Sequence, residues 1–432
     1  MEYYPLRRSL HIGFVSTRFA GTDGVSLETS KWAEILESIG HKCFYFSGLS
    51  DRPEDVSYVV PEAYYRHPDV EYRHLSFFGS TTRTAEDSEW IHDWRNTFKT
   101  HLYAYINQFE IDVLIPENIM AIPLQIPLAL ALTELIAETG IPTIAHHHDF
   151  AWERKRFLVN GVEDYLSAAF PADLPSIQHV VINSQGHSAL ARKRGVSSMI
   201  IPNVMHYEKE PPGIDDYSAD LRQTLGLSDS DVFILQPTRV VQRKGIEHAI
   251  ELVQRLDQDA ILVISHASGD EGDEYEQRLR EYADLLNVRT LFCDEHFDEY
   301  RRIEPDGRKI YSLNDAYPHA DLVSYPSVFE GFGNAFLEAV YFKKPIVVNN
   351  YSIYATDIRP LGFKVVEFDD FVTEDTVRQT QEVLSNPQLV ESMVETNYQL
   401  ALQYFSYRVL WRKLDILLAN VIGTRPTFAL AE

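Results

Sequence analysis

The chain has 432 residues and is 45% hydrophobic, so it is long enough to form two or three domains with substantial cores. Its 39 basic and 64 acidic residues give a net charge of −25, which argues against binding to nucleic acid or to an anionic membrane surface. The sequence has two cysteines, Cys43 and Cys293, which excludes a disulfide framework or a cysteine metal site and favours a cytoplasmic location.

The first half of the chain alternates apolar runs with amphipathic stretches, a pattern typical of one parallel-sheet domain. The predicted strands are Leu10–Val15, Cys43–Ser47, Ile111–Ile115, Ile141–His146, Val180–Asn183 and Met199–Pro202. The predicted helices are Leu27–Ile39, Glu89–Phe109, Pro123–Glu138 and Gln185–Arg194. Residues 53–101 are polar and aromatic and are otherwise hard to assign. The most apolar stretch, residues 119–132, is interrupted by prolines and is too short for a membrane span.

The loop after the first predicted strand contains Gly21 and Gly24. A strand, a glycine loop and a helix form the usual phosphate-approach unit of a doubly wound sheet. The loop lacks the G-x-G-x-x-G pattern, so there is no dinucleotide fingerprint, and the two glycines also fit an ordinary turn.

The strand Ile141–His146 runs into a polar segment, His146-His147-His148-Asp149. Neighbouring side chains on an extended chain point to opposite faces, which disfavours a metal site made by these histidines. A structural role and a ligand-binding role both remain open. Arg154, Lys155 and Arg156 follow, and this basic cluster fits either a solvated helix face or the recognition of an anionic ligand.

Residues 206–220 contain prolines and acids and are predicted to connect two domains, after which the alternation resumes. The predicted strands are Val232–Gln236, Ile261–Ser265, Arg289–Cys293, Asp321–Tyr325 and Val365–Phe368. The predicted helices are Ile246–Leu256, Tyr311–His319, one from about Asn334, Asp375–Leu384 and Leu389–Leu418.

Arg239 and Lys244 lie between a predicted strand and a predicted helix of this second half. A planar guanidinium and a compact ammonium at the carboxyl edge of a sheet would neutralise a diphosphate. On spacing alone, a solvated basic turn explains the pair equally well.

Glu330 and Glu338 lie on either side of a predicted helix start, in the stretch Phe329-Glu-Gly-Phe-Gly-Asn-Ala-Phe-Leu-Glu-Ala339. Carboxylates suit the hydroxyl groups of a ligand, and the amides of a helix N-terminus suit phosphate. A ligand that carries both groups is a nucleotide sugar. The alternative is a strand–turn–helix unit with two solvated glutamates.

This stretch resembles the E-x7-E motif of the retaining family 4 glycosyltransferases, and the similarity continues through Asn314–Tyr317 and Lys344–Val348. The resemblance implies the α/β GT-B fold, with two Rossmann-like domains facing across a cleft. It implies transfer of a hexose, with retention, from a nucleoside diphosphate sugar such as a UDP- or GDP-sugar. Residues 297–309 are longer and more charged than the usual family loop.

The resemblance also implies roles for individual residues. The expected catalytic residues are Arg239, Lys244, Glu330 and His148. The expected donor-binding residues are Gly21, Gly24, Arg239, Lys244, Glu330, Gly331, Phe332, Gly333, Asn334, Ala335 and Glu338. The expected acceptor-binding residues are His147, Asp149, Arg154 and Arg156.

The expected division is an acceptor-binding domain at residues 1–207, a donor-binding domain at 208–400 and a helix at 401–432 that crosses back to the first domain. The strings Asp229-Ser-Asp231 and Asp257-Gln-Asp259 lie away from the carboxyl ends of strands, so we expect a metal-independent enzyme without a cofactor. The expected acceptor is small and soluble, and an anionic acceptor such as a glycerate derivative fits the basic cluster. The alternatives are a non-catalytic GT-B subunit that binds a glycan or partner and a sugar-nucleotide epimerase.

Overall fold

The computed structural model describes residues 9–21, 23–256, 258–268 and 272–423, which fall into two compact units. Unit 1 runs to Pro202 and takes up the chain again from Arg408, whereas unit 2 is Asn203–Tyr407. Each unit is built around its own parallel sheet. Within the described ranges, no helix is long and apolar enough to cross a membrane.

Unit 1 contains a seven-stranded parallel sheet of order β3-β2-β1-β4-β5-β6-β7 in the described chain. Its strands are β1 (His11–Val15), β2 (Lys42–Ser47), β3 (Ser57–Val59), β4 (Val113–Pro116), β5 (Thr143–His147), β6 (Ile177–Val181) and β7 (Ser198–Ile200). The central strands β1, β4 and β5 are buried along almost their whole length because helices cover both faces of the sheet.

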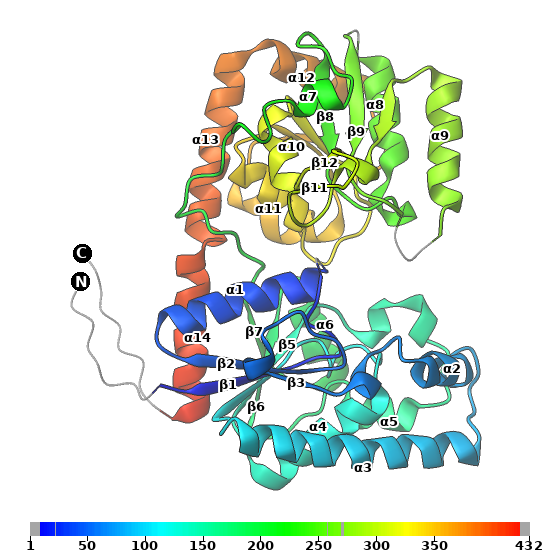
Figure 1. Ribbon diagram of the computed structural model, residues 1–432, viewed down its shortest axis with the longest axis vertical. Helices are drawn as coiled ribbons and strands as arrows, with labels where there is room; N and C mark the ends of the chain where they lie inside the picture. The colour runs from blue at the N-terminus through cyan, green and yellow to red at the C-terminus, as the bar shows by residue number, and fades with distance from the viewer. Residues whose placement is uncertain (1–8, 22, 257, 269–271, 424–432) are drawn as a thin grey trace, which may run out of the picture. The chain divides into compact units, whose positions relative to one another are not determined.

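The helices of unit 1 lie on both faces of this sheet (Figure 1). They are α1 (Gly24–Ser38), α2 (Pro68–Phe77), α3 (Ala85–Gln108), α4 (Ile126–Thr139), α5 (Glu163–Ala169), α6 (Ser184–Arg194) and α14 (Tyr407–Ile422). Helices α3 and α4 bury Phe98, Leu102, Leu128 and Leu132 in one core with β1, β2 and β4. Helix α14 is tied to β7 by a hydrogen bond of 2.7 Å from Lys413 Nζ to the carbonyl oxygen of Ile200.

Two parts of the sequence prediction need correction. Residues 53–101 contain β3 and α2, and helix α3 begins at Ala85 because Thr84 and Asp87 form a capping box there. The single helix predicted over 389–418 is wrong, since the chain forms α13 (Pro387–Tyr404) and α14 with a break at Phe405-Ser406. At this break the carbonyl oxygen of Phe405 accepts a hydrogen bond of 2.9 Å from the amide of Met205, a residue far away in the chain.

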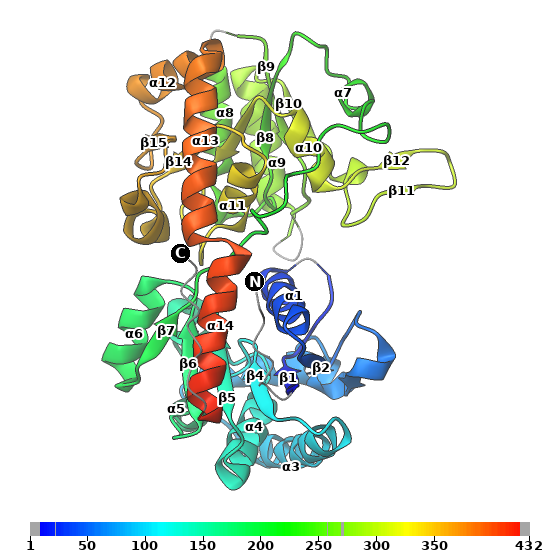
Figure 2. The same ribbon diagram turned by 90° about the vertical axis from the view of Figure 1, so that its left-hand side faces the viewer.

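Unit 2 contains a six-stranded parallel sheet of order β10-β9-β8-β13-β14-β15 in the described chain. Its strands are β8 (Val232–Gln236), β9 (Ala260–Ile264), β10 (Thr290–Phe292), β13 (Leu322–Tyr325), β14 (Ile346–Asn349) and β15 (Val366–Phe368). A separate hairpin of β11 (Arg302–Ile303) and β12 (Lys309–Ile310) projects from this unit (Figure 2). It lies mostly within the charged stretch 297–309, for which no element was predicted.

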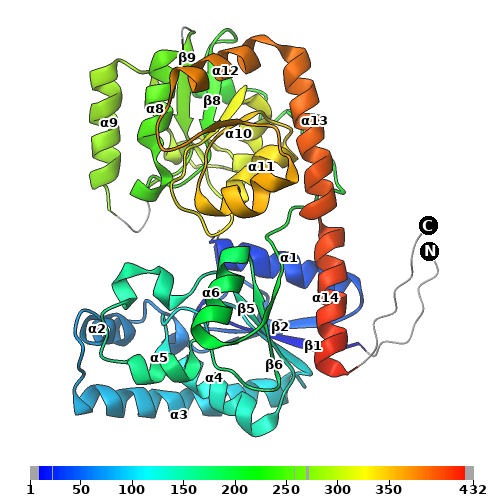
Figure 3. The same ribbon diagram turned by 180° about the vertical axis from the view of Figure 1, so that it is seen from behind.

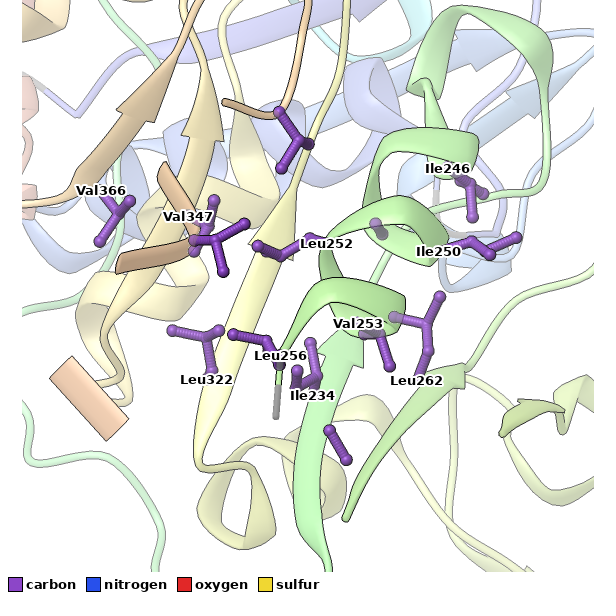
Figure 4. Close-up of a cluster of buried hydrophobic side chains, with 14 of the residues drawn as sticks. Ile234, Ile246, Ile250, Leu252, Val253, Leu256, Leu262, Leu322, Val347 and Val366 are labelled. Carbon is purple, nitrogen blue, oxygen red and sulfur yellow. The ribbon is translucent and has the colours of Figure 1, made fainter. Parts of the chain in front are cut away.

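The helices of unit 2 also cover two faces. They are α7 (Leu221–Thr224), α8 (Ile246–Arg255), α9 (Glu274–Leu286), α10 (Leu313–His319), α11 (Asn334–Tyr341), α12 (Glu374–Ser385) and α13. Branched side chains of α8, such as Ile246, Ile250 and Val253, pack with Ile234 and Leu322 of the sheet in a buried cluster (Figure 4). Helices α10 and α11 are well seen in Figure 3, and α11 carries the second glutamate of the motif.

Candidate active site

The carboxyl ends of β8 and β13 bring the predicted donor-binding residues of unit 2 together. β8 ends at Gln236 and leads into a 3-10 turn, Gln242–Lys244, which precedes α8. Its neighbour β13 ends at Tyr325 and leads to Glu330 and then to α11. Parallel strands place the loops that follow them at one edge, which is where α/β proteins bind ligands.

Glu330 is held by two cations from the other loop. Lys244 Nζ donates a hydrogen bond to Glu330 Oε1, and Arg243 Nη1 donates one of 3.2 Å to Oε2. Burial alone would raise the pKa of Glu330, but the charges of Lys244 and Arg243 bring that pKa below its ordinary value. Glu330 is therefore ionised, and the pair fixes the two loops against each other.

Arg239 and His266 complete the basic character of this edge. The side chain of Arg239 is exposed and makes no hydrogen bond or ion pair with any described residue. His266 follows β9, and burial together with the charges of Lys244 and Arg239 lowers its pKa to about 4. An anion at this edge would meet Arg239, Lys244 and Arg243 as cations and His266 as a neutral ring.

The start of α11 has a backbone geometry that requires glycine. Gly333 has φ +131°, and a Cβ atom there would lie 2.4 Å from Tyr351 Oη. Tyr351 Oη in turn donates a hydrogen bond of 2.8 Å to the carbonyl oxygen of Phe332. Asn334 is the first helical residue and accepts a hydrogen bond of 2.7 Å from Asn203 Nδ2 at its side-chain oxygen. The side chain of Ala335, in the first turn, is small. A ligand could therefore approach the backbone amides at the start of this helix.

Glu338 lies one turn into α11, as the motif spacing predicts. Its Oε2 accepts a hydrogen bond of 2.9 Å from Tyr317 Oη on α10. The tyrosine was not among the predicted site residues, although it belongs to the stretch Asn314–Tyr317 that carries the family resemblance.

The glycine loop of unit 1 precedes helix α1. Gly21 has φ +73°, and its amide donates a hydrogen bond of 3.0 Å to Asp51 Oδ2. Gly24 is the exposed first residue of α1, and Asp23 caps the helix by accepting from the amides of Val25 and Ser26. The cap already occupies two of the helix-start amides that an anionic ligand would use.

The histidine segment of unit 1 alternates between two environments, as an extended strand end must. His146 Nδ1 and His148 Nε2 lie 3.0 and 3.2 Å from the same oxygen, Oε2 of Glu117. Trp32 of α1 stacks on the ring of His146 with centroids 4.2 Å apart. His147 points the other way, where its Nε2 lies 3.0 Å from Nδ1 of His179.

Glu117 and Asn118 follow β4 directly and were missed by the sequence argument. Asn118 Oδ1 accepts a hydrogen bond of 3.0 Å from the amide of His148, and its Nδ2 donates one of 2.8 Å to Asp149 Oδ1. Burial alone would raise the pKa of Glu117, but His146 and His148 lower it. The same contact raises the pKa of His148 although burial opposes this. The signal that was overlooked is a carboxylate immediately after a buried parallel strand.

Glu117, His146 and His148 raise the question of a metal ion, because their ligand atoms all lie within 4.8 Å of one another. Metal-bound histidines ordinarily donate the other ring N–H to an acceptor. Among the described residues, neither His146 Nε2 nor His148 Nδ1 has such a partner. The two hydrogen bonds to an ionised Glu117 account for the cluster, so we interpret it as a hydrogen-bonded network.

In the basic cluster of unit 1, Arg154 joins the 3-10 turns Ala151–Glu153 and Lys155–Phe157. Lys155 and Arg156 begin the second turn, so the cluster is not on an α-helix face. Arg154 Nε donates a hydrogen bond to Asp149, so these two predicted acceptor residues bind each other. Arg156 lies over the ring of Phe157 at 4.6 Å, and its charge helps lower the pKa of His74, after the larger effect of burial.

The two acidic strings were not expected to bind a metal ion, and the structure describes the contacts of Asp231 in the first of them. Asp231 binds Arg289 Nη1 at 2.7 Å and accepts a hydrogen bond of 2.7 Å from the amide of Ser228, so both of its oxygens are engaged. Asp257, in the other string, lies outside the described residues.

Two parallel sheets, with a basic loop and two glutamates at the carboxyl edge of the sheet of unit 2, are the features of a GT-B glycosyltransferase. Comparison with known proteins supports this class. The family described as "Glycosyl transferases group 1" matches residues 218–400. The chain belongs to this family, which is glycosyltransferase family 4.

Among its relatives are two mannosylglucosylglycerate synthases. The one from Thermotoga maritima is 31% identical over 96% of this chain and 100% of its own length. The one from Petrotoga mobilis is 33% identical over 83% of this chain and 86% of its own.

A mannosylglucosyl-3-phosphoglycerate synthase of Petrotoga mobilis is 27% identical over 52% of this chain and 44% of its own length.

Solved structures support the fold. A glycosyltransferase from Rickettsia africae superposes with a TM-score of 0.70 at 13% identity, covering 97% of this chain and 100% of its own. A sucrose-phosphate synthase from Thermosynechococcus elongatus has a TM-score of 0.66 at 15% identity, covering 96% and 99%.

Proposed function

We propose that this glycosyltransferase moves a hexose, with retention, from a nucleoside diphosphate sugar to a small acceptor that carries a glycerate group. The observation that carries the proposal is the edge of unit 2, where Arg239 is exposed, without a partner among the described residues, beside the Lys244–Glu330 pair. The names of the relatives point to mannose as the hexose and to glucosylglycerate as the acceptor.

In this proposal the bond between the sugar C1 and the diphosphate oxygen breaks while C1 bonds to the acceptor oxygen on the same face. Arg239, Lys244 and the amides near Gly333 and Asn334 stabilise the departing diphosphate. Glu330 holds sugar hydroxyls, as does His148, and Glu338 holds the ribose of the nucleotide. The leaving phosphate accepts the proton of the acceptor hydroxyl.

Acceptor binding is assigned to unit 1. Asp149, Arg154 and Arg156 remain in this role, with the glycerate carboxylate as the partner of the arginines. His147 is dropped from the acceptor site because it is buried against His179 and Phe150. Gly21 and Gly24 stay with the donor because Gly21 lies in the loop before α1 and Gly24 is the first residue of that helix.

The test is an activity screen of UDP-, GDP- and ADP-sugars against glucosylglycerate, its 3-phosphate and neutral glucosides. The proposal predicts transfer from GDP-mannose to an acceptor with a carboxylate, and it predicts that activity survives exhaustive chelation with EDTA. Release of free sugar without an acceptor product would favour the epimerase, and the absence of turnover with every donor would reject the proposed function.

A further inference from the structure

Glu117 and Asn118 are consecutive residues that between them hold both the ring and the backbone of the His148 segment. Glu117 Oε2 lies 3.2 Å from His148 Nε2, and Asn118 Oδ1 accepts the amide of His148 at 3.0 Å. Asn118 has φ +59°, a left-handed conformation that asparagine tolerates better than most residues. This turn folds the end of β4 against the end of β5, where the amide of Asn118 also donates a hydrogen bond of 2.8 Å to the carbonyl oxygen of His146.

The hydrogen bond to Glu117 uses one ring nitrogen of His148 and leaves the other available to a ligand. An ionised carboxylate accepts hydrogen bonds only, so His148 Nε2 must carry its proton toward Glu117. The other nitrogen, Nδ1, makes no hydrogen bond with any described residue. A neighbour that fixes one nitrogen of a histidine determines what the other one presents.

His146 and Trp32 keep Glu117 from turning away. His146 Nδ1 donates to the same oxygen at 3.0 Å, and Trp32 stacks on its ring. Glu117 and His146 are almost completely buried, whereas His148 is partly exposed. The network is thus anchored inside unit 1 and ends at His148, whose side chain is 9% exposed against 1% or less for the other two.

We propose that Glu117 and Asn118 are positioning residues for His148, which fix its orientation and turn Nδ1 toward the hydroxyl groups of the sugar being transferred. The proposal rests on the proposed function, because it takes His148 as a ligand of the donor sugar. Neither residue touches the substrate, and their effect on turnover passes through His148.

A double-mutant cycle between Glu117 and His148 tests the coupling. Glu117→Gln preserves the shape and should lower kcat by about tenfold to a hundredfold, because the charge-assisted hydrogen bond that orients His148 is replaced by a weaker neutral one. The KM for the acceptor should stay nearly constant. In a His148→Ala background the same substitution should change kcat less than about threefold, because the imidazole that Glu117 orients is then missing.

Asn118→Ala gives a second route in case Glu117 variants fold poorly, and it should likewise lose its effect on kcat in the His148→Ala background. Asp87→Asn is the matched control because Asp87 is buried in unit 1 but caps α3. It should lower Tm and leave kcat unchanged, which separates positioning from general stability.

Three results would overturn the proposal. These are additive effects of Glu117→Gln and His148→Ala, unchanged kcat in His148→Ala alone, or a divalent metal ion that co-purifies with the wild type and is lost in Glu117→Gln. The last result would make the cluster a metal site. All three can occur in an enzyme that transfers mannose normally, so they are distinct from a failure of the proposed function.

Discussion

Lys244 donates a hydrogen bond to Glu330, and the two side chains are only 10% and 9% exposed. This pair joins the loop after β8 to the loop after β13, two segments that are 86 positions apart in sequence. It makes Lys244 part of the framework of unit 2, whereas Arg239, in the same loop, is exposed and without a partner among the described residues.

Replacing these two cations should therefore have different consequences. Arg239→Ala should lower kcat by about 10²-fold or more, because charge stabilisation of a leaving group is worth several kcal/mol, and should leave Tm nearly unchanged. Lys244→Ala should lower kcat similarly and also destabilise the protein by about 3 kcal/mol, because Glu330 stays buried with one cation fewer. Steady-state kinetics and urea unfolding measure both effects. Arg378→Ala, at an exposed arginine of α12, should change neither, and near-normal kinetics in both loop variants would contradict the diphosphate assignment.

Gly333→Ala should weaken donor binding and stability together. An alanine there combines φ +131° with a contact of 2.4 Å to Tyr351 Oη, so the start of α11 must move. Gly362 is a matched control, since it has φ +95° but an added Cβ atom would meet nothing within 4 Å. Gly362→Ala should cost about 1–2 kcal/mol from backbone strain alone, with donor KM unchanged. A Gly333→Ala enzyme with wild-type donor KM would argue against a ligand at this helix start.

Unit 1 should lose stability in mild acid. Burial lowers the pKa of His179 to about 4, and the pKa of His147 lies well below its ordinary value for the same reason. As pH falls below about 6.5, His147 and His179 bind protons in the unfolded chain but stay neutral in the folded protein. The free energy of unfolding therefore decreases between about pH 6.5 and 4. The loss from His179 alone reaches about 3 kcal/mol at the acid end. His179→Gln should flatten the fall in Tm over this range and exposed His92→Gln should not, whereas equal slopes in all three proteins would refute the assignment.

Acceptor recognition should depend on Arg154 and Arg156. Arg154→Gln and Arg156→Gln should each raise the KM for a glycerate acceptor by about tenfold, the worth of one charge-assisted hydrogen bond, and leave the donor KM unchanged. Lys155→Gln, on the exposed residue between them, serves as the control. If neutral glucosides are used as well as the acids, or if the arginine variants bind acceptor normally, the carboxylate is recognised elsewhere.

The sequence predicted those parts of the fold that depend on local patterns. The strand Val232–Gln236 and the start of a helix at Asn334 agree with the structure because an apolar run and a glycine-rich turn specify them locally. The break between α13 and α14 could not be predicted, since no glycine or proline marks it and the hydrogen bond made there comes from Met205, far away in the chain.

The same distinction applies to the candidate site. The E-x7-E motif and the basic loop are short and contiguous, and they point to the edge of unit 2 where the structure brings them together. The partners of the predicted residues come from elsewhere in the sequence. Glu117 meets His148 from a different strand, and Tyr317 meets Glu338 from α10, so only the folded chain reveals them.

The most direct test of the account is the anomeric configuration of the product made from GDP-α-mannose and glucosylglycerate. The account predicts a single new mannosyl signal of α configuration in the proton NMR spectrum, which grows about 10²-fold more slowly with Arg239→Ala and is unaffected by EDTA. A β-linked product, or no transfer from any nucleoside diphosphate sugar to a glycerate-bearing acceptor, would contradict it.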